Sequence, residues 1–155
     1  MGCWKMIENL LKPTLVKGGK VTDDRGSLSF VNDLDLSNVK RFYTVQNHSV
    51  GFIRAWHGHL LESKIFIVLQ GSILACAVRM TDTKDPNKDV PVEKFVLSSD
   101  SPTALYIPKG FANGFMNLSG DAILLVLSST SLEESKNDDY RFAFDYWDPW
   151  KIEQR

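Results

Sequence analysis

Two histidines lie one residue apart in the stretch Arg-Ala-Trp-His-Gly-His, in a chain that has three histidines in total. Alternate residues of a strand point to one face, so His57 and His59 are expected to share a face with Ala55. Glu62 and Lys64 follow closely, and such a cluster of titratable groups is more typical of a functional site than of packing. Imidazoles move protons near neutral pH and also bind metals, so both chemistries are candidates.

The elements that position these histidines are expected to be strands. Short runs rich in β-branched and aromatic residues alternate with turn signals, which favours an all-β sandwich or barrel such as a jelly roll. One short helix is expected at the start, where Met6, Leu10 and Leu11 form an apolar stripe that ends at Pro13. The expected strands lie within 27–31, 39–46, 51–59, 63–71, 72–80, 93–98, 103–108, 114–119 and 122–129.

The bulk properties indicate a single domain over residues 1–155. The net charge of −1 gives no global basic field to hold nucleic acid. No apolar run approaches a membrane span, and no signal peptide is recognised at the N-terminus, so no membrane partner and a cytoplasmic location are expected. Cys76 lies in an apolar run and is expected to be buried rather than half of a disulfide.

The spacing around the histidine pair resembles the first motif of the jelly-roll cupins. Gly51 is followed by five residues, then His57 and His59, and Gly71 stands at the expected distance beyond them. The position that holds a glutamate in cupins is Lys64 here. The resemblance implies a cupin jelly-roll β-barrel or sandwich.

The second cupin motif is matched by Pro-x-Gly-x-x-Asn-x-x-x-Asn over 108–117, with Asn113 in place of the usual histidine. A divalent metal site needs three or four neutral or anionic ligands. The ammonium of Lys64 has no lone pair to offer, so no bound metal is expected. Because Glu62 is close enough in sequence to restore a ligand, a metal-dependent cupin enzyme stays an alternative.

Further motifs resemble the cupin sugar-nucleotide epimerases and ketoisomerases, in particular the dTDP-4-dehydrorhamnose 3,5-epimerases and the dTDP-4-keto-6-deoxyglucose 3,4-ketoisomerases. The matching stretches are DRGSLSF (24–30), QNHS (46–49), RAWH (54–57) and IPKGFANGF (107–115). The resemblance implies an isomerase that needs no cofactor and acts beside the keto group of a nucleotide-linked 4-keto-6-deoxy sugar. Its product would serve bacterial surface polysaccharide or unusual-sugar synthesis.

The resemblance also implies roles for individual residues. His57 aligns with the base of both enzyme groups, whereas His59 aligns with the ketoisomerase pair and is expected to carry a second proton or hold the sugar. A cation beside the enolate oxygen stabilises its charge, and Lys64 is the candidate. The epimerases use a tyrosine donor after the second motif that this chain lacks, so Tyr43 is the candidate substitute. The choice between epimerase and ketoisomerase stays open.

The expected partner is a nucleotide-diphosphate sugar, dTDP-linked by resemblance. Arginines suit a diphosphate because their planar fork donates two parallel hydrogen bonds. A non-catalytic sugar-nucleotide-binding cupin is the main alternative function. The candidate substrate-binding residues are Arg25, Gln46, Asn47, Arg54, Glu62, Asn113 and Asn117.

A homodimer is expected from the ends of the chain. The aromatic tail after residue 139 and the N-terminal segment offer more apolar surface than a small barrel covers alone. The tail, with Trp147 and Trp150, is therefore expected to pack in the core or against a second subunit.

Overall fold

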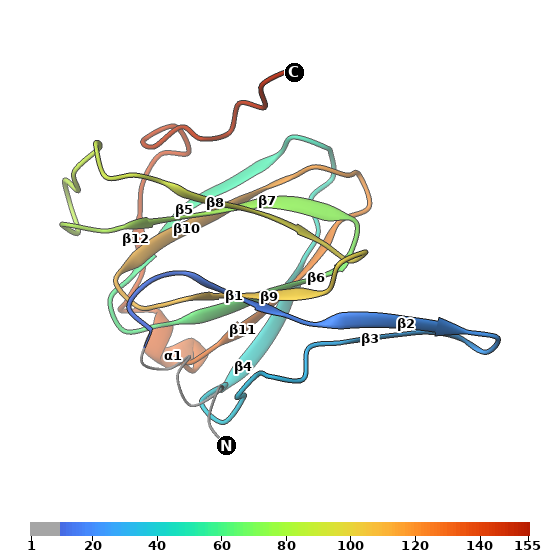
Figure 1. Cartoon of the computed structure of the whole chain (residues 1–155). Coiled ribbons are helices and arrows are strands. Elements are labelled where there is room, and N and C mark those ends of the chain that lie inside the picture. The colour runs from blue at the N-terminus through green and yellow to red at the C-terminus, as the bar shows by residue number, and fades with distance from the viewer. Residues whose placement is uncertain (1–9) are drawn as a thin grey trace.

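A computed structural model describes residues 10–155, which form two antiparallel sheets that face one another (Figure 1). The first sheet has the strand order β1-β9-β6-β11-β4, the second has the order β12-β5-β10-β7-β8, and β2 pairs with β3 in a separate hairpin. The strands are β1 (Thr14–Lys17), β2 (Gly19–Asp23), β3 (Gly26–Phe30), β4 (Arg41–Val45), β5 (Ile53–His59), β6 (Lys64–Gln70), β7 (Ser72–Arg79), β8 (Glu93–Ser98), β9 (Thr103–Ile107), β10 (Phe111–Asn117), β11 (Ile123–Ser128) and β12 (Tyr140–Arg141).

The core lies between the two sheets and follows from the alternation of side chains along the strands. In β11 the buried residues Leu124 and Val126 point inward, and the residue between them, Leu125, is only partly buried. Phe66 from β6 and Phe115 from β10 join the same cluster. The expected all-β jelly roll is confirmed, and each of the nine expected strand regions overlaps one of the strands β3 to β11.

A second apolar cluster covers the outer face of the second sheet and is built around Trp56. Its indole Nε1 donates to the carbonyl oxygens of Phe144 at 3.1 Å and Trp147 at 3.0 Å. Trp147 and Trp150 are 3% and 5% exposed. These two tryptophans are therefore covered by their own chain, whereas Phe144 and Ile152 of the same tail are exposed. The dimer stays a prediction.

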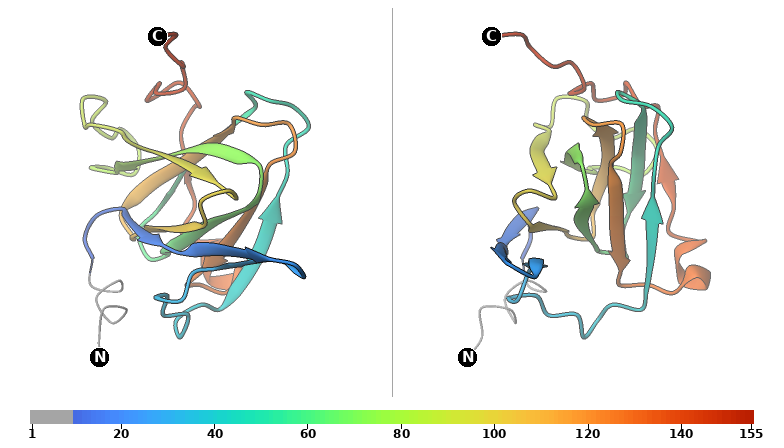
Figure 2. Two further views of the ribbon diagram at one scale, coloured as in Figure 1. Left: turned by 45° about the vertical axis from the view of Figure 1, so that its right-hand side comes forward. Right: turned by 90° about the vertical axis from the view of Figure 1, so that its right-hand side faces the viewer.

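The C-terminal segment crosses from the first sheet to the second (Figure 2). After β11 it forms α1 (Leu132–Ser135), which begins with a capping box between Ser131 and Glu134. The Lys40 ammonium lies 2.8 Å from the Glu134 carboxylate and ties α1 to the start of β4. The segment then continues to β12, at the edge of the second sheet.

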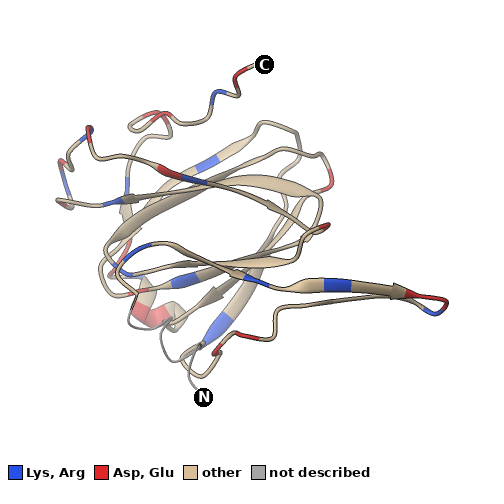
Figure 3. Ribbon diagram, viewed as in Figure 1, with Lys and Arg blue, Asp and Glu red and all other residues tan. Residues whose placement is uncertain are grey.

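Some expectations differ from the structure or lie beyond it. The expected N-terminal helix falls mostly on residues 1–9, outside the described residues, and 10–12 are not helical. Cys76 is fully buried, as expected, and burial raises its pKa to about 12. In residues 10–155 no helix has the length and hydropathy to cross a membrane. Acidic and basic positions are interspersed, many of them in loops and at strand ends (Figure 3).

Candidate active site

A cavity of about 390 Å³ lies between the sheets and is bordered on one side by the C-terminal segment. It receives side chains from β4, β5, β6, β10 and β11, so residues far apart in sequence meet there. Both predicted histidines and the predicted lysine face it. The predicted site residues that line this cavity are Tyr43, Arg54, His57, His59, Glu62, Lys64 and Asn113.

A β-bulge decides which residues of β5 face the cavity. Asn113 of β10 pairs with His57 but Phe115 pairs with Arg54, so two residues of β5 oppose Gly114 alone. The bulge brings Arg54 onto the same wall as the two histidines. Ala55 was expected on that wall, but it packs against the outer apolar cluster, because the bulge breaks the strict alternation between Arg54 and His57.

The ring of His59 is held from one side. Its Nδ1 lies 2.6 Å from the backbone oxygen of Asp138 and 3.2 Å from a carboxylate oxygen of Glu62. The Nε2 atom is buried and has no hydrogen-bond partner among the described residues. Burial, followed by the charge of Lys64, lowers the His59 pKa, while the bond to Asp138 and the charge of Glu62 act in the opposite direction.

His57 faces the cavity in a more cationic environment. Burial, followed by the charges of Lys64 and Arg141, lowers its pKa to about 4, and the charge of Asp139 acts in the opposite direction. Its imidazole is therefore neutral at physiological pH. A neutral ring has an unprotonated nitrogen that can accept a proton.

Glu62 is a buried carboxylate in this wall that contacts several polar and cationic groups. Its side chain is 1% exposed and accepts hydrogen bonds from Arg41 at 3.1 Å, from Thr130 at 3.1 Å and from the hydroxyl of Ser128. It also lies 4.0 Å from the ammonium of Lys64. A buried carboxylate needs such partners, so much of its bonding capacity is used within the protein.

Lys64 and Tyr43 bring a cation and a phenol to the same cavity. Burial lowers the Lys64 pKa, and the charge of Glu62 opposes that effect. Burial, with the charge of Glu62, raises the Tyr43 pKa to about 12. The phenol therefore keeps its proton at neutral pH and is a donor. The guanidinium of Arg41 lies 5.2 Å from the centre of the Tyr43 ring.

Two of the predicted binding residues act behind the cavity wall. Arg54 donates from Nε to Asn47 at 2.6 Å, and Asn47 donates to Asn117 at 2.9 Å. Asn47 and Asn117 are buried and do not line the cavity, so they orient Arg54. Asn113 lines the cavity and donates to the backbone oxygen of His57 at 3.2 Å.

The two remaining predicted residues do not reach the cavity of their own chain. Arg25 lies in the turn of the β2–β3 hairpin, where its side chain is 85% exposed and pairs with Asp23 at 2.5 Å. Gln46 follows β4, is exposed and does not line the cavity.

Sequence reasoning missed several polar residues of the site, of which Arg41 had a recognisable signal. Arg41 stands two residues before Tyr43 in a predicted strand, so both were expected on one face. Asp138 had no such signal, because its partners are 76 to 79 residues away. The other residues missed are Ser128, Thr130, Asp139 and Arg141.

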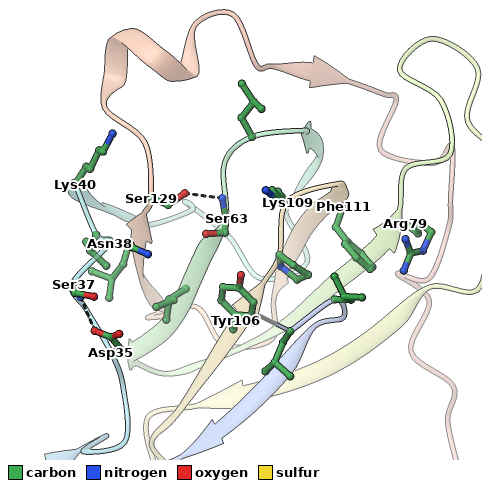
Figure 4. Close-up of a pocket in the computed structure, with 17 residues that line it drawn as sticks. Asp35, Ser37, Asn38, Lys40, Ser63, Arg79, Tyr106, Lys109, Phe111 and Ser129 are labelled. Atoms are coloured by element: carbon green, nitrogen blue, oxygen red, sulfur yellow. Dashed lines mark hydrogen bonds between the residues drawn. The ribbon is translucent and has the colours of Figure 1, made fainter. Parts of the chain in front are cut away.

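A larger cleft of about 690 Å³ lies elsewhere, on the outer face of the first sheet (Figure 4). Its floor includes Ile65, Tyr106 and Leu127, and Lys40 and Lys109 also line it. It contains none of the predicted site residues, so the smaller inner cavity is the candidate active site.

The metal alternative rested on Glu62 restoring a ligand set. No group of three or more His, Cys, Asp and Glu side chains suited to a metal ion occurs among residues 10–155. Glu62 is instead bonded to Arg41 and to two hydroxyls. The absence of a metal stays a prediction.

Solved structures with the same fold include two 3,4-ketoisomerases. QdtA from Thermoanaerobacterium thermosaccharolyticum, a sugar 3,4-ketoisomerase in complex with TDP, is 22% identical, with a TM-score of 0.65 over 88% of this chain and 93% of that one. The TDP-quinovose 3,4-ketoisomerase WlaRB from Campylobacter jejuni is 25% identical, with a TM-score of 0.62 over 88% and 98%.

A 3,5-epimerase shares the fold as well. The dTDP-4-dehydrorhamnose 3,5-epimerase from Bacillus anthracis, with TDP and pyrophosphate bound, is 22% identical, with a TM-score of 0.73 over 92% of this chain and 86% of that one. A comparison with curated protein sequences finds no match. The family model described as FdtA, WxcM-like, C-terminal, matches residues 12–147, and the chain therefore belongs to that family.

Proposed function

We propose that this protein is a cofactor-independent sugar-nucleotide isomerase of the 3,4-ketoisomerase type. The observation that carries the proposal is the placement of His57 and His59 on one wall of a cavity that also holds the ammonium of Lys64. Two proton carriers on one wall suit a reaction that removes a proton from one carbon and returns it to the neighbouring carbon.

The chemistry needs no atom from outside the substrate. A base removes the proton on C3 of the 4-keto sugar, and the electrons of that bond form an enolate with its charge on O4. The O3 hydroxyl proton moves to O4, and the proton held by the base returns to C4, which leaves the carbonyl at C3. Lys64 stabilises the oxygen that carries the negative charge.

His57 is the proposed base. Its low pKa keeps the ring neutral, and its position on the cavity wall gives it access to a bound sugar. His59 is the proposed second carrier, which moves the hydroxyl proton or holds the sugar. Positioned proton transfer of this kind contributes about 10²–10⁴-fold to a rate.

The substrate is proposed to be a TDP-linked 4-keto-6-deoxy sugar. Support comes from Arg54, a cavity guanidinium oriented by Asn47, and from the TDP bound in related structures. The diphosphate suits the planar fork of an arginine. Such a reaction belongs in the cytoplasm, in the synthesis of bacterial polysaccharides or unusual sugars.

A homodimer is the proposed assembly, for a reason other than the aromatic tail. The β2–β3 hairpin projects beyond the first sheet (Figures 1 and 2) and carries the exposed cross-strand pair Val21 and Leu28. An isolated two-stranded hairpin is marginally stable in water, which favours a second subunit against it. Arg25, at its tip, would then meet substrate in the cavity of that second subunit.

Tyr43 favours one alternative, an epimerase. Its protonated phenol lines the cavity and could supply the donor that the sequence lacks after the second motif. An epimerase would label the sugar ring and invert a centre, while the ketone would stay on C4.

The test is a proton NMR time course in deuterium oxide with TDP-4-keto-6-deoxyglucose. The proposal expects the appearance of a 3-keto sugar, with deuterium at C4 in those turnovers in which the base exchanges its proton with solvent before returning it. Inversion with the ketone still at C4 would identify an epimerase. Binding with neither conversion nor exchange would identify a non-catalytic sugar-nucleotide-binding protein and overturn the proposal.

A further inference from the structure

Asp138 is buried behind the cavity, where it joins three parts of the site. It lies between α1 and β12, and 2% of its surface is exposed. Its carboxylate accepts the backbone N–H groups of Leu60, Leu61 and Glu62 at 2.7, 2.9 and 2.9 Å. These amides form the turn that follows the histidines, so one side chain fixes the path from β5 toward β6.

The backbone of the same residue holds His59. A carbonyl oxygen only accepts hydrogen bonds, so the 2.6 Å contact from Asp138 requires a proton on Nδ1 of the imidazole. The Glu62 carboxylate, 3.2 Å from the same nitrogen, is also an acceptor when ionised and favours the same tautomer. In the neutral ring the remaining nitrogen, Nε2, then carries the lone pair.

The two contacts depend on each other. The three hydrogen bonds from backbone N–H groups to its carboxylate hold Asp138 against the turn. This places the backbone carbonyl of Asp138 beside His59. We propose that Asp138 is a positioning residue that holds His59 as the Nδ1–H tautomer, with Nε2 free to accept a proton in the cavity. This proposal deepens the proposed function and rests on it for its catalytic consequence.

The first test reads the tautomer directly, without substrate. Long-range proton–nitrogen NMR spectra of the 15N-labelled protein are assigned with His48→Asn, His57→Asn and His59→Asn, one for each of the three histidines. The proposal expects His59 to give the pattern of a neutral ring protonated on Nδ1. A ring protonated on Nε2 alone would overturn the proposal, whether or not the protein is an isomerase.

The second test uses Asp138→Asn to weaken the hydrogen bonds between this side chain and the turn. The asparagine amide keeps the size of the carboxylate but replaces one acceptor oxygen with an NH₂ group that faces backbone donors. The hydrogen bonds to the turn should therefore weaken. We expect His59 to show mixed tautomers and kcat to fall about 10²-fold, as a small displacement of a reacting group does. The affinity for TDP should change less than threefold, since the diphosphate contact comes from Arg54.

The matched control is Asp82→Asn. Asp82 also accepts backbone N–H groups with its carboxylate, from Lys84 at 3.2 Å and Asp85 at 2.7 Å, but it lies in the exposed loop between β7 and β8. It should leave the tautomer of His59 and kcat unchanged. An Asp138→Asn protein with the native tautomer and full kcat would overturn the positioning role.

The outcomes separate this inference from the proposed function. If the wild-type protein has the Nδ1–H tautomer but converts no sugar, the tautomer assignment stands and the isomerase proposal fails. If Asp138→Asn does not fold, the wild-type spectrum still decides the tautomer. Asp138→Glu, which keeps the charge, should then recover part of the native His59 signal, and its failure to do so would count against the role of the carboxylate.

Discussion

His57 and His59 share a wall but differ in what surrounds their rings. His59 is held at Nδ1 by a carbonyl and a carboxylate, whereas His57 is kept neutral by burial and by two nearby cations. A neutral imidazole is a weak base, so it can remove a proton from carbon only where that carbon is acidified, as the carbon beside a ketone is. The two rings can therefore divide one reaction between them.

The substitution His57→Asn tests the base. It should lower the rate of ring-proton exchange by about 10²–10⁴-fold, because a positioned base contributes that much. The affinity for TDP, measured by calorimetry, should stay within a few-fold of wild type. Full exchange at saturating substrate would show that His57 is not the base and would favour a binding protein.

The companion substitution His59→Asn separates the two enzyme types. A large loss of turnover indicates a ketoisomerase, in which both histidines carry protons. A mild effect indicates epimerase-like use of His57 alone. Turnover is followed by the NMR time course, at substrate concentrations well above KM.

Arg54→Ala should weaken binding rather than chemistry. Its contact with a diphosphate is the same in the ground and transition states, so KM should rise while kcat changes little. Arg79→Ala is a suitable control, because Arg79 lies over Phe111 and lines the outer cleft instead of the inner cavity. A fall in kcat at unchanged KM for Arg54→Ala would assign this arginine to the chemical step.

The lowered pKa of His57 predicts how stability depends on pH. In the unfolded chain the ring takes a proton near its ordinary value of 6.5, but the folded ring does so only near 4. Between pH 4 and 6.5 the unfolded state therefore binds more protons than the folded state. The free energy of unfolding should fall as the pH drops from 6.5 toward 4. Urea unfolding should show a weaker pH dependence for His57→Asn than for wild type. An equal pH dependence of the two proteins would contradict the lowered pKa of His57.

At the level of elements, the bulge between β5 and β10 sets the composition of the cavity wall. An added Cβ at Gly114 would lie 2.5 Å from the Cβ of Ala55 and 2.9 Å from the backbone oxygen of Arg54. The two strands can therefore approach this closely only with glycine at that position. The wall that carries Arg54 and both histidines depends on this contact.

Gly114→Ala should lower the free energy of unfolding by about 1–3 kcal/mol, as overpacking in a core does. It should also raise KM, because Arg54 belongs to the displaced strand. Gly120→Ala is the control, since its added Cβ would meet only Val50 at 3.7 Å. Chemical denaturation of both variants checks the prediction, and equal stabilities would contradict it.

The sequence predicted the strands better than it predicted the partners within the site. Period-two apolar runs located β4 to β11, because each of these strands has residues that face a core. The run over β3 was located as well, although that strand lies in the exposed hairpin. The bulge was not predictable, since it depends on the register between β5 and β10, and so Ala55 was placed on the wrong face. Asp138 was missed for the same reason, because its role comes from contacts with a distant turn.

For the whole molecule, light scattering at micromolar concentration should give twice the chain mass of 17.5 kDa. The variant Val21→Ser/Leu28→Ser removes the exposed apolar pair of the hairpin and should shift the mass toward the monomer. Lys20→Ser, on the same hairpin, should leave the mass unchanged. A wild-type monomer would contradict the proposed assembly.

The path of the C-terminal segment has a consequence for how this enzyme could diversify. One short stretch after β11 brings Leu132, Ser135, Lys136, Asp139 and Arg141 to the mouth of the cavity, while the histidines come from β5. Under the proposed function, recognition at the mouth and proton transfer at the wall are therefore encoded in separate parts of the chain. Exchanging the mouth residues while keeping Asp138 is a direct route to new sugar selectivity with the same chemistry.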